Sequence, residues 1–368
     1  MSWRLPRNWK ASAYFPGSVQ WQWLSWLCLL GVVGAYLATW VNGNWPMLTD
    51  PQLQNDDART ALFPFHRYGA ADALADDPIA TEMLGFMPPG VFVLYRFLVP
   101  VVDIFVAAKI VQGVALSILL YAAWVLARSR RAGLAGGCVL LFLFAHDWFA
   151  INRVAGGLPR AFGFPLFALW LSGVIAQKRK VRAAAPLLAA LTYPSVMLMI
   201  LAAEGLFALR NSGRLPWSVV LRRLRRYALV VVACFVFVLP ATLGGEERGR
   251  IHTLEEARKE PAFGRKGRLW ILPFADPVRA LGDAYVDAYR PRGSSPWPQL
   301  KTWAAQDKKM TAVTIAAILL LIPFFAWGRI PSYAWSFAVG AVILYWLSRT
   351  YAFRLYSPER YYSFGMRM

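Results

Sequence analysis

Seven carboxylates lie between Asp50 and Glu82 of a chain that is otherwise strongly basic. The whole sequence has 40 Lys and Arg against 20 Asp and Glu, which gives a formal net charge of +20. The acidic segment includes the adjacent pair Asp56 and Asp57 and follows a long apolar run. Carboxylates where a membrane meets water can hold a divalent metal ion or accept a proton. This segment is therefore the first place to look for chemistry.

The adjacent acids Asp56 and Asp57 have two interpretations. Neighbouring carboxylates repel each other, so a pair is stable only with solvent, a metal ion or nearby cations. Arg59, His66 and Arg67 follow closely. Together with the acids, they would suit an anionic, lipid-linked substrate at an outer membrane face. The alternative is that the acids begin a helix, where they cap its N-terminus and complement its dipole.

A second group of candidate residues lies at and after the end of the apolar run 133–150. His146 and Asp147 are predicted to emerge on the same side of the membrane as the acidic segment. Ionisable side chains at membrane depth are costly and usually face a polar interior. His146 is a metal ligand, a hydrogen-bond donor or simply an interfacial residue. Arg153 and Arg160 follow around a glycine-containing turn, where they either bind phosphate through their fork geometry or anchor a tight turn at headgroup level.

The remaining charged residues in apolar surroundings form a C-terminal group and two isolated cases. Arg354 and Arg360 follow the last apolar run and add capacity to bind phosphate. Tyrosines beside them would stack against a sugar or lie in the membrane interface. Lys109 and Glu204 lie near the ends of apolar runs, and we expect Glu204 to snorkel to water rather than to take part in catalysis.

Several common catalytic motifs are absent from the sequence. It contains no Walker A loop, no H-E-x-x-H, no G-x-S-x-G and no paired C-x-x-C, which disfavours nucleotide hydrolysis and zinc proteolysis. The three cysteines, Cys28, Cys138 and Cys234, lie far apart in apolar runs. Their positions indicate packing rather than a disulfide framework or a metal site.

The composition indicates an integral membrane protein. Of the 368 residues, 58% are hydrophobic and 15% are aromatic, and the mean hydropathy is +0.41. Several apolar runs reach the roughly 18–20 residues that a helix needs to cross a bilayer. The strongest basic clusters, such as Arg128–Arg131 and Arg222–Arg226, lie at the ends of these runs. Such clusters are typical of cytoplasmic ends facing anionic lipid headgroups, which argues against nucleic acid as a partner.

The predicted fold is an all-α polytopic membrane protein with about nine membrane-embedded helical segments. Residues 1–20 form a cytoplasmic N-terminal segment, 21–348 a helical transmembrane domain and 349–368 an outer C-terminal segment. The domain includes an outer loop, 42–103, and an outer cap loop, 244–310, and both loops contain interfacial helices. The nine segments are 21–41, 104–127, 133–150, 161–176, 183–193, 195–209, 227–243, 311–327 and 331–348.

Two parts of this topology depend on proline and on length. The segments 183–193 and 195–209 form a short hairpin broken at Pro194, because proline cannot continue the helical hydrogen-bond ladder. A single long span over 183–209 is the alternative, and it would place a basic flank outside. The apolar stretch Pro88–Val102 is too short to cross, so we expect it to lie in the interface or to dip into the outer leaflet.

This layout resembles the GT-C superfamily of integral-membrane glycosyltransferases, over nearly the whole chain and mostly in architecture. The residues that carry the resemblance are Asp56-Asp57-Ala58-Arg59, Pro88-Pro89-Gly90, His146-Asp147, Gly157-Leu158-Pro159-Arg160 and Leu355-Tyr356-Ser357-Pro358-Glu359-Arg360-Tyr361. Two features depart from the family pattern. The acidic motif is Asp-Asp rather than Asp-x-Asp, and larger relatives continue beyond the arginine-tyrosine segment. The chain is therefore either a compact member or a piece of a longer protein.

The resemblance implies transfer of a sugar from a polyprenyl-phosphate donor to an acceptor at the outer, periplasmic face. Carried over by position, Asp56 or Asp57 is the base or a metal ligand, and Asp147 is a second acidic partner. Either these three acids hold a divalent cation, Mg²⁺ or Mn²⁺, or transfer is metal-independent, as in many members. The predominance of Arg over Lys favours a bacterial inner membrane.

The same resemblance assigns roles to the basic residues. Arg153, Arg160 and Arg360 are candidates to steady the departing lipid phosphate. The other candidate substrate-binding residues are Arg59, His66, Arg67, His146 and Arg354.

Two other classes of protein would use some of the same features. A transporter or flippase for a lipid-linked or anionic solute would bind through the outer arginines, but it needs a polar path across the membrane. The predicted spans contain few charges at mid-membrane depth, which counts against ion-coupled transport. A non-catalytic membrane scaffold would use the acids and arginines only to solvate its outer face.

Overall fold

A computed structural model describes residues 19–54, 56–69, 74, 76–129, 133–146, 153–210, 217–243, 254–261 and most of 336–347. Every regular element in these ranges is a helix. The predicted all-α class is therefore confirmed for the part of the chain that the structure describes. The predictions for Asp147, Arg354, Arg360 and the segment 311–327 lie outside it.

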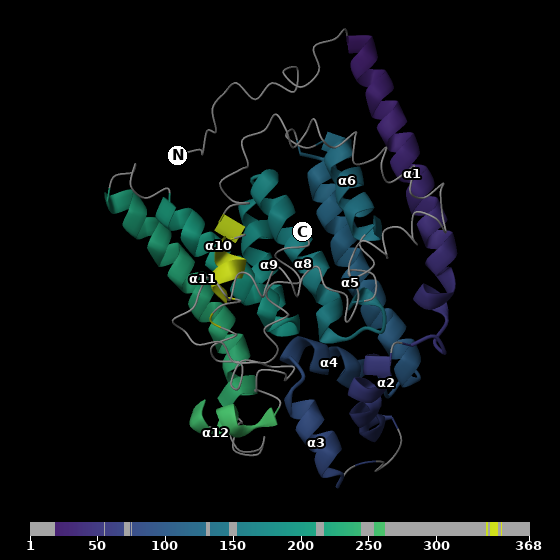
Figure 1. The fold of residues 1–368 in the computed structure, drawn as a ribbon, viewed down its shortest axis with the longest axis vertical. Helices are drawn as coiled ribbons and strands as arrows, with labels where there is room; N and C mark the ends of the chain where they lie inside the picture. The colour runs from purple at the N-terminus through teal and green to yellow at the C-terminus, as the bar shows by residue number, and fades with distance from the viewer. Residues whose placement is uncertain are drawn as a thin grey trace.

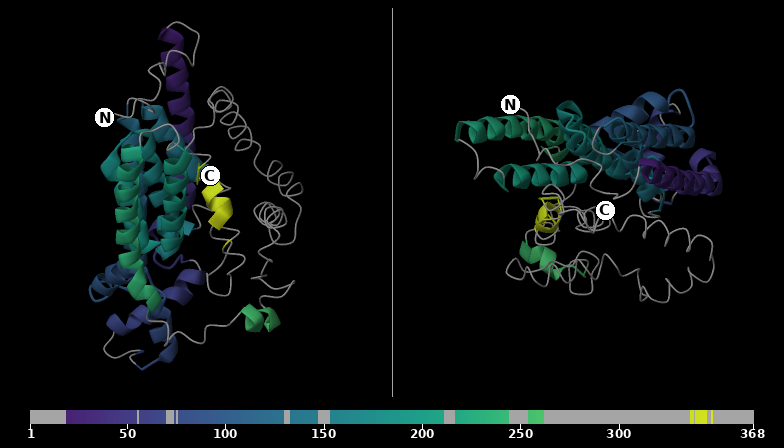
Figure 2. Two further views of the ribbon diagram at one scale, coloured as in Figure 1. Left: turned by 90° about the vertical axis from the view of Figure 1, so that its left-hand side faces the viewer. Right: turned by 90° about the horizontal axis from the view of Figure 1, so that it is seen from above.

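In the part of the chain that the structure describes, seven longer helices form a bundle along the long axis of the molecule (Figure 1). Among these helices, α5 packs against α6 and α8, and α9 packs against α8, α10 and α11. The helices α1 and α11 lie at opposite edges of the bundle in Figure 1 and in the right-hand view of Figure 2. The seven helices are α1 (Val19–Thr49), α5 (Ile104–Ala127), α6 (Gly133–His146), α8 (Gly163–Ile175), α9 (Arg179–Thr192), α10 (Pro194–Arg210) and α11 (Trp217–Leu243).

Short helices gather at one end of this bundle (Figure 1). They are α2 (Asp56–Leu62), η2 (Phe63–Tyr68), α3 (Pro78–Gly85) and α4 (Pro89–Leu98). Farther along the chain, α12 (Leu254–Lys259) lies at a similar height in Figure 1 but stands apart from these helices in Figure 2. We call the end of the bundle formed by α2, η2, α3 and α4 the loop end. The four-residue turn η3 (Pro159–Phe162) contacts α5, α8 and α9 and leads directly into α8.

The helix α5 has the bounds that its hydropathy predicts. The Asp103 side chain caps its N-terminus by accepting a hydrogen bond from the Phe105 N–H at 2.8 Å. At the other end, the helix stops at the basic residue Arg128. Among the described residues, α5 is the one helix that is both long and apolar enough to cross a membrane. The expectation of nine membrane segments therefore goes beyond what these helices show.

Other boundaries confirm one expectation and correct two. The break at Tyr193 and Pro194 is confirmed, because α9 ends at Thr192 and α10 begins at Pro194. In contrast, α1 continues to Thr49 instead of ending at residue 41. Its last turns include polar residues that lie outside the predicted apolar run. Likewise, α11 begins at Trp217, so the cluster Arg222–Arg226 is helical rather than a loop. Arginine has a high helix propensity, which explains this extension.

Candidate functional site at the loop end

Two predicted site residues, 103 positions apart in sequence, meet at the loop end. The Arg160 Nη1 atom donates to Asp57 Oδ2 at 2.5 Å. Asp57 lies in the first turn of α2, whereas Arg160 lies in η3 just before α8. The Asp57 side chain is 65% exposed and the Arg160 side chain is 18% exposed. An exposed carboxylate is thus held against a guanidinium that is mostly covered by protein.

The turn before Arg160 has a shape that only glycine adopts easily. Gly157 has a φ of +66°, a region that L side chains rarely adopt. Its carbonyl accepts a hydrogen bond from the buried Tyr95 hydroxyl at 3.1 Å. A Cβ atom at Gly157 would lie 2.3 Å from the Ala108 carbonyl oxygen and 2.7 Å from the Tyr95 hydroxyl. The backbone therefore packs so closely against α4 and α5 that the position of Arg160 is fixed.

One face of α5 connects this turn to the chain that leads to Asp57. The buried Gln112 side chain accepts from the Gly156 N–H at 3.2 Å through Oε1 and donates to the Leu48 carbonyl at 3.4 Å through Nε2. One turn earlier, Lys109 Nζ donates to the carbonyls of Met47 and Leu53, at 2.6 and 2.8 Å. Residues three apart lie on the same helix face. Lys109 and Gln112 thus hold the end of α1, the loop after it and the Gly156 turn together.

Two arginines predicted to bind substrate donate to the backbone of the loop end. Arg59 Nη2 donates to the Gln52 carbonyl at 3.1 Å. Arg67 Nη2 donates to the Leu74 carbonyl at 2.7 Å, and a longer contact of 3.4 Å joins it to the Thr81 hydroxyl. These bonds fold the acidic segment back onto itself. The third candidate in this segment, His66, is exposed on η2.

The other candidates are only partly described. Asp56 begins α2 and His146 ends α6, but the side chains of both lie outside the description. Arg153 is half-buried just before the Gly156 turn. Within the described part of the chain, no group of three or more His, Cys, Asp and Glu could hold a metal ion. Because two of the three predicted metal ligands, Asp56 and Asp147, fall outside that search, the metal site stays a prediction.

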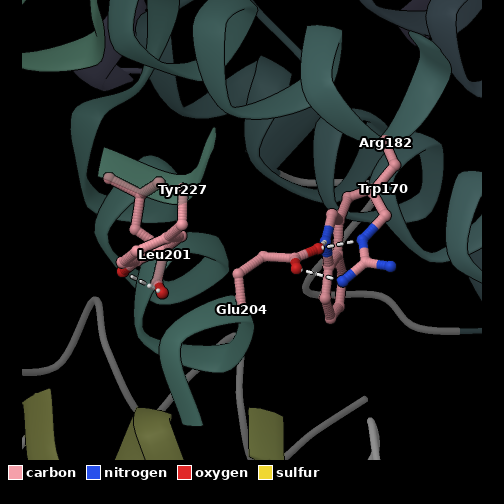
Figure 3. A network of polar contacts seen from close by, with 5 residues as sticks. All are labelled: Trp170, Arg182, Leu201, Glu204 and Tyr227. Carbon is pink, nitrogen blue, oxygen red and sulfur yellow. Dashed lines mark hydrogen bonds and ion pairs between the residues drawn. The ribbon is translucent and has the colours of Figure 1, made fainter. Parts of the chain in front are cut away.

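A second polar network lies among α8, α9 and α10, and Figure 3 shows it. The Glu204 carboxylate accepts from both Nε and Nη2 of Arg182, and it also accepts from Trp170 Nε1 at 2.7 Å. Glu204 is 16% exposed and Arg182 is 32% exposed. Tyr227 of α11 donates to the Leu201 carbonyl beside this network at 2.7 Å. The expectation that Glu204 snorkels to water is wrong, because its carboxylate is bonded inside the bundle.

Arg160 keeps hydrogen-bonding capacity that this structure leaves unused. Its Nε atom is buried and has no hydrogen-bond partner among the described residues. A guanidinium has five N–H donors in a fixed fork, and a buried donor without a partner is unfavourable. The site therefore combines an exposed carboxylate with a fixed cation that has at least one donor to spare.

Comparisons with known proteins add no family to this description. No family model, curated protein or solved structure matches the chain. Any functional assignment therefore depends on the residues and the geometry above.

Proposed function

We propose that this protein is a GT-C-type membrane glycosyltransferase, which moves a sugar from a polyprenyl-phosphate donor to an acceptor at the outer face of a bacterial inner membrane. The observation that carries the proposal is the contact between Asp57 and Arg160. A candidate base and a candidate phosphate-binding cation, predicted from separate motifs, lie side by side at one end of a helical bundle.

Exposed apolar side chains support the membrane part of the proposal. The helix α5 exposes Leu120 and Trp124, and α11 exposes Leu229, Val232 and Val236, all on the outside of the bundle. Water would make such surfaces unfavourable, whereas lipid tails cover them at no cost. We therefore propose that the nine segments expected from the sequence are embedded in the membrane.

The helix α4 supports an interfacial position for the loop end. Its Val91 and Tyr95 are buried against the bundle, whereas Phe97 is 74% exposed and Val101, just after the helix, is 81% exposed. A helix of 10 residues is too short to cross a bilayer. An apolar face on such a helix suits the boundary between headgroups and acyl chains.

Charge also differs between the two ends of the bundle. Asp57 lies at the loop end, whereas Arg128 follows the last turn of α5, and Lys178 and Arg179 lie at the N-terminus of α9, at the opposite end. Basic residues are retained on the cytoplasmic side. The loop end would then face the periplasm, where polyprenyl-phosphate sugars are used by this superfamily.

In the proposed reaction, an acceptor hydroxyl oxygen attacks the anomeric carbon of the donor sugar. The bond between that carbon and the phosphate oxygen breaks, and its electron pair leaves with the lipid phosphate. Asp57 takes the hydroxyl proton, a role that typically contributes 10²- to 10⁴-fold. Arg160 stabilises the negative charge that develops on the phosphate.

A transfer assay tests the proposal directly. The full chain in liposomes is supplied with radiolabelled polyprenyl-phosphate sugars, and the wild type is compared with Asp57→Asn, Asp56→Asn and Asp147→Asn. Transfer by the wild type should fall about 100-fold or more in Asp57→Asn. The matched control is Glu82→Gln, which removes an exposed carboxylate of α3 in the same segment.

Three outcomes would contradict this account. Full transfer in Asp57→Asn would show that Asp57 is not the base. If transfer were then lost in Asp56→Asn or Asp147→Asn alone, the residue changed in that variant would be the base. Uptake of a phosphate-linked solute without sugar transfer would identify a transporter instead. Equal loss in Glu82→Gln would show that general acidity of the segment matters rather than one carboxylate.

A further inference from the structure

We infer that the Asp57–Arg160 ion pair is an anion-exchange site, in which the phosphate of a lipid-linked donor replaces Asp57 on Arg160. The replacement frees the Asp57 carboxylate to act as a base. This inference rests on the proposed function and concerns the order of events at the same site. Donor binding would have to precede activation of the base.

The two partners differ in their freedom to move. Asp57 is mostly exposed and lies in the first turn of α2, a helix of seven residues. Arg160 is mostly covered and follows a turn held by Tyr95 and Gln112. The carboxylate can therefore rotate into solvent while the guanidinium stays in place.

Hydrogen-bonding capacity favours a phosphate over the carboxylate. The resolved contact uses one nitrogen of Arg160, Nη1, and its buried Nε has no partner among the described residues. The phosphate of a polyprenyl-phosphate sugar is a diester, and its two non-bridging oxygens can accept two parallel N–H bonds from one guanidinium. Satisfying a buried donor while keeping an ion pair is more favourable than the single contact with Asp57.

The ion pair with Asp57 is weak enough to be displaced. Pairs with an exposed partner change an equilibrium constant by about fivefold or less. Such a pair forms in the absence of substrate and yields to a phosphate that accepts two bonds from the guanidinium.

The exchange also has a chemical consequence. A guanidinium beside a carboxylate favours the charged form of the carboxylate and so makes it a weaker base. Asp57 is therefore a weaker base until a phosphate occupies Arg160. The pair would slow proton transfer from a water molecule or an acceptor before the donor sugar is present.

Binding of a donor fragment that cannot transfer a sugar tests this inference. Farnesyl phosphate, a short polyprenyl phosphate, is titrated by calorimetry into the full chain in detergent micelles, with farnesol and inorganic phosphate as parallel probes. The wild type is compared with Asp57→Asn, Arg160→Gln and Arg160→Lys. The matched controls are Glu82→Gln and Arg225→Gln, which remove exposed charges of the same signs elsewhere.

We expect Asp57→Asn to bind farnesyl phosphate about two- to fivefold more tightly than the wild type, because the competing carboxylate is gone. Arg160→Gln should bind at least tenfold more weakly, and Arg160→Lys, which keeps the charge but loses the fork, should be intermediate. The two controls should match the wild type. A tightening with inorganic phosphate as well would show that the phosphate alone drives exchange, and a tightening with farnesyl phosphate alone would show that the lipid is also needed.

Unchanged or weaker binding by Asp57→Asn would overturn the exchange. Wild-type binding that is absent, or equally tight for farnesol, would overturn Arg160 as a phosphate site. None of these results depends on sugar transfer. A chain that shows the exchange but transfers no sugar would contradict the proposed function and support this inference. Sugar transfer without tighter binding of farnesyl phosphate by Asp57→Asn would support the proposed function and contradict this inference.

Discussion

Two arginine–carboxylate pairs lie at opposite ends of the bundle and differ in how completely they are bonded. Glu204 receives two bonds from Arg182 and one from Trp170, so both of its oxygens are used. Asp57 accepts from Arg160 Nη1, and the buried Arg160 Nε has no hydrogen-bond partner among the described residues. We call the Glu204 pair saturated, because both carboxylate oxygens are bonded, and the Asp57 pair unsaturated, because the Arg160 guanidinium keeps an unused donor.

The surroundings of the two pairs explain this difference. The Glu204 pair, together with Trp170, connects the three consecutive helices α8, α9 and α10. The backbones of α8 and α9 lie close together here, since a Cβ at Gly173 would lie 2.7 Å from Arg182 N. The Asp57 pair instead joins a short helix to a glycine turn. A saturated pair within packed helices mainly stabilises the fold, whereas an unsaturated pair at a surface can exchange its partner.

Removing one partner of the saturated pair should have the largest effect on stability. Glu204→Leu leaves Arg182 and Trp170 Nε1 without their acceptor. We expect a loss of about 2–4 kcal/mol in the free energy of unfolding, somewhat less than for fully buried pairs. Denaturant unfolding in detergent measures it. The double variant Arg182→Met with Glu204→Leu should recover most of the loss, and a single-variant loss below about 0.5 kcal/mol would show that the pair is not structural.

The glycine turn that supports the unsaturated pair is the next most sensitive element. Gly157→Ala places a Cβ against the Ala108 carbonyl at a positive φ. The expected cost is about 2–3 kcal/mol of stability, together with reduced sugar transfer as Arg160 shifts. Gly113→Ala is the matched control, because nothing lies within 4 Å of a Cβ there. Equal effects at both positions would show that the turn is not under this constraint.

A smaller effect is expected where α5 connects the two halves of the loop end. Gln112→Met fills similar space but leaves the Gly156 N–H and the Leu48 carbonyl without their side-chain partner. We expect a loss of about 1–2 kcal/mol in stability and a larger proportional loss in transfer. Ser117→Ala on the same helix removes only a bond to the helix's own Gly113 carbonyl and should change neither quantity. A loss of stability with full transfer per folded molecule would argue against a positioning role.

The smallest effect is predicted for Tyr95→Phe, which removes the bond to the Gly157 carbonyl at a cost of about 1 kcal/mol. Burial raises the pKa of Tyr95 well above its ordinary value of 10.0, so the folded phenol stays protonated. Its contribution should be constant below pH 10 and should fall above it, where only the unfolded chain releases the proton. Tyr95→Phe should reduce this alkaline loss of stability. An unchanged slope above pH 10 would show that other groups cause it.

Local patterns in the sequence predicted part of this fold. The bounds of α5 follow from an apolar run between Asp103 and Arg128, and the break before α10 follows from Pro194. Hydropathy failed at the end of α1 and at the start of α11, where polar and basic residues are helical. In those places, helix propensity and contacts with other segments determine the structure rather than apolarity.

The candidate site was predictable in its members but not in its contacts. The motifs marked Asp57 and Arg160 separately, and only the fold brings them together across 103 residues. Lys109 and Gln112 carried a usable signal, since they are polar and three residues apart within an apolar helix. Their partners are mostly backbone carbonyls, which no side-chain pattern reveals.

The account is tested most directly by measuring sugar transfer and thermal unfolding together in Asp57→Asn and Glu204→Gln. We predict that Asp57→Asn loses transfer about 100-fold or more with an unfolding temperature close to that of the wild type. Glu204→Gln should unfold at a lower temperature but keep its transfer rate per folded molecule. The opposite pattern, with an unstable Asp57→Asn that still transfers sugar and a stable Glu204→Gln that does not, would contradict the assignment of both pairs.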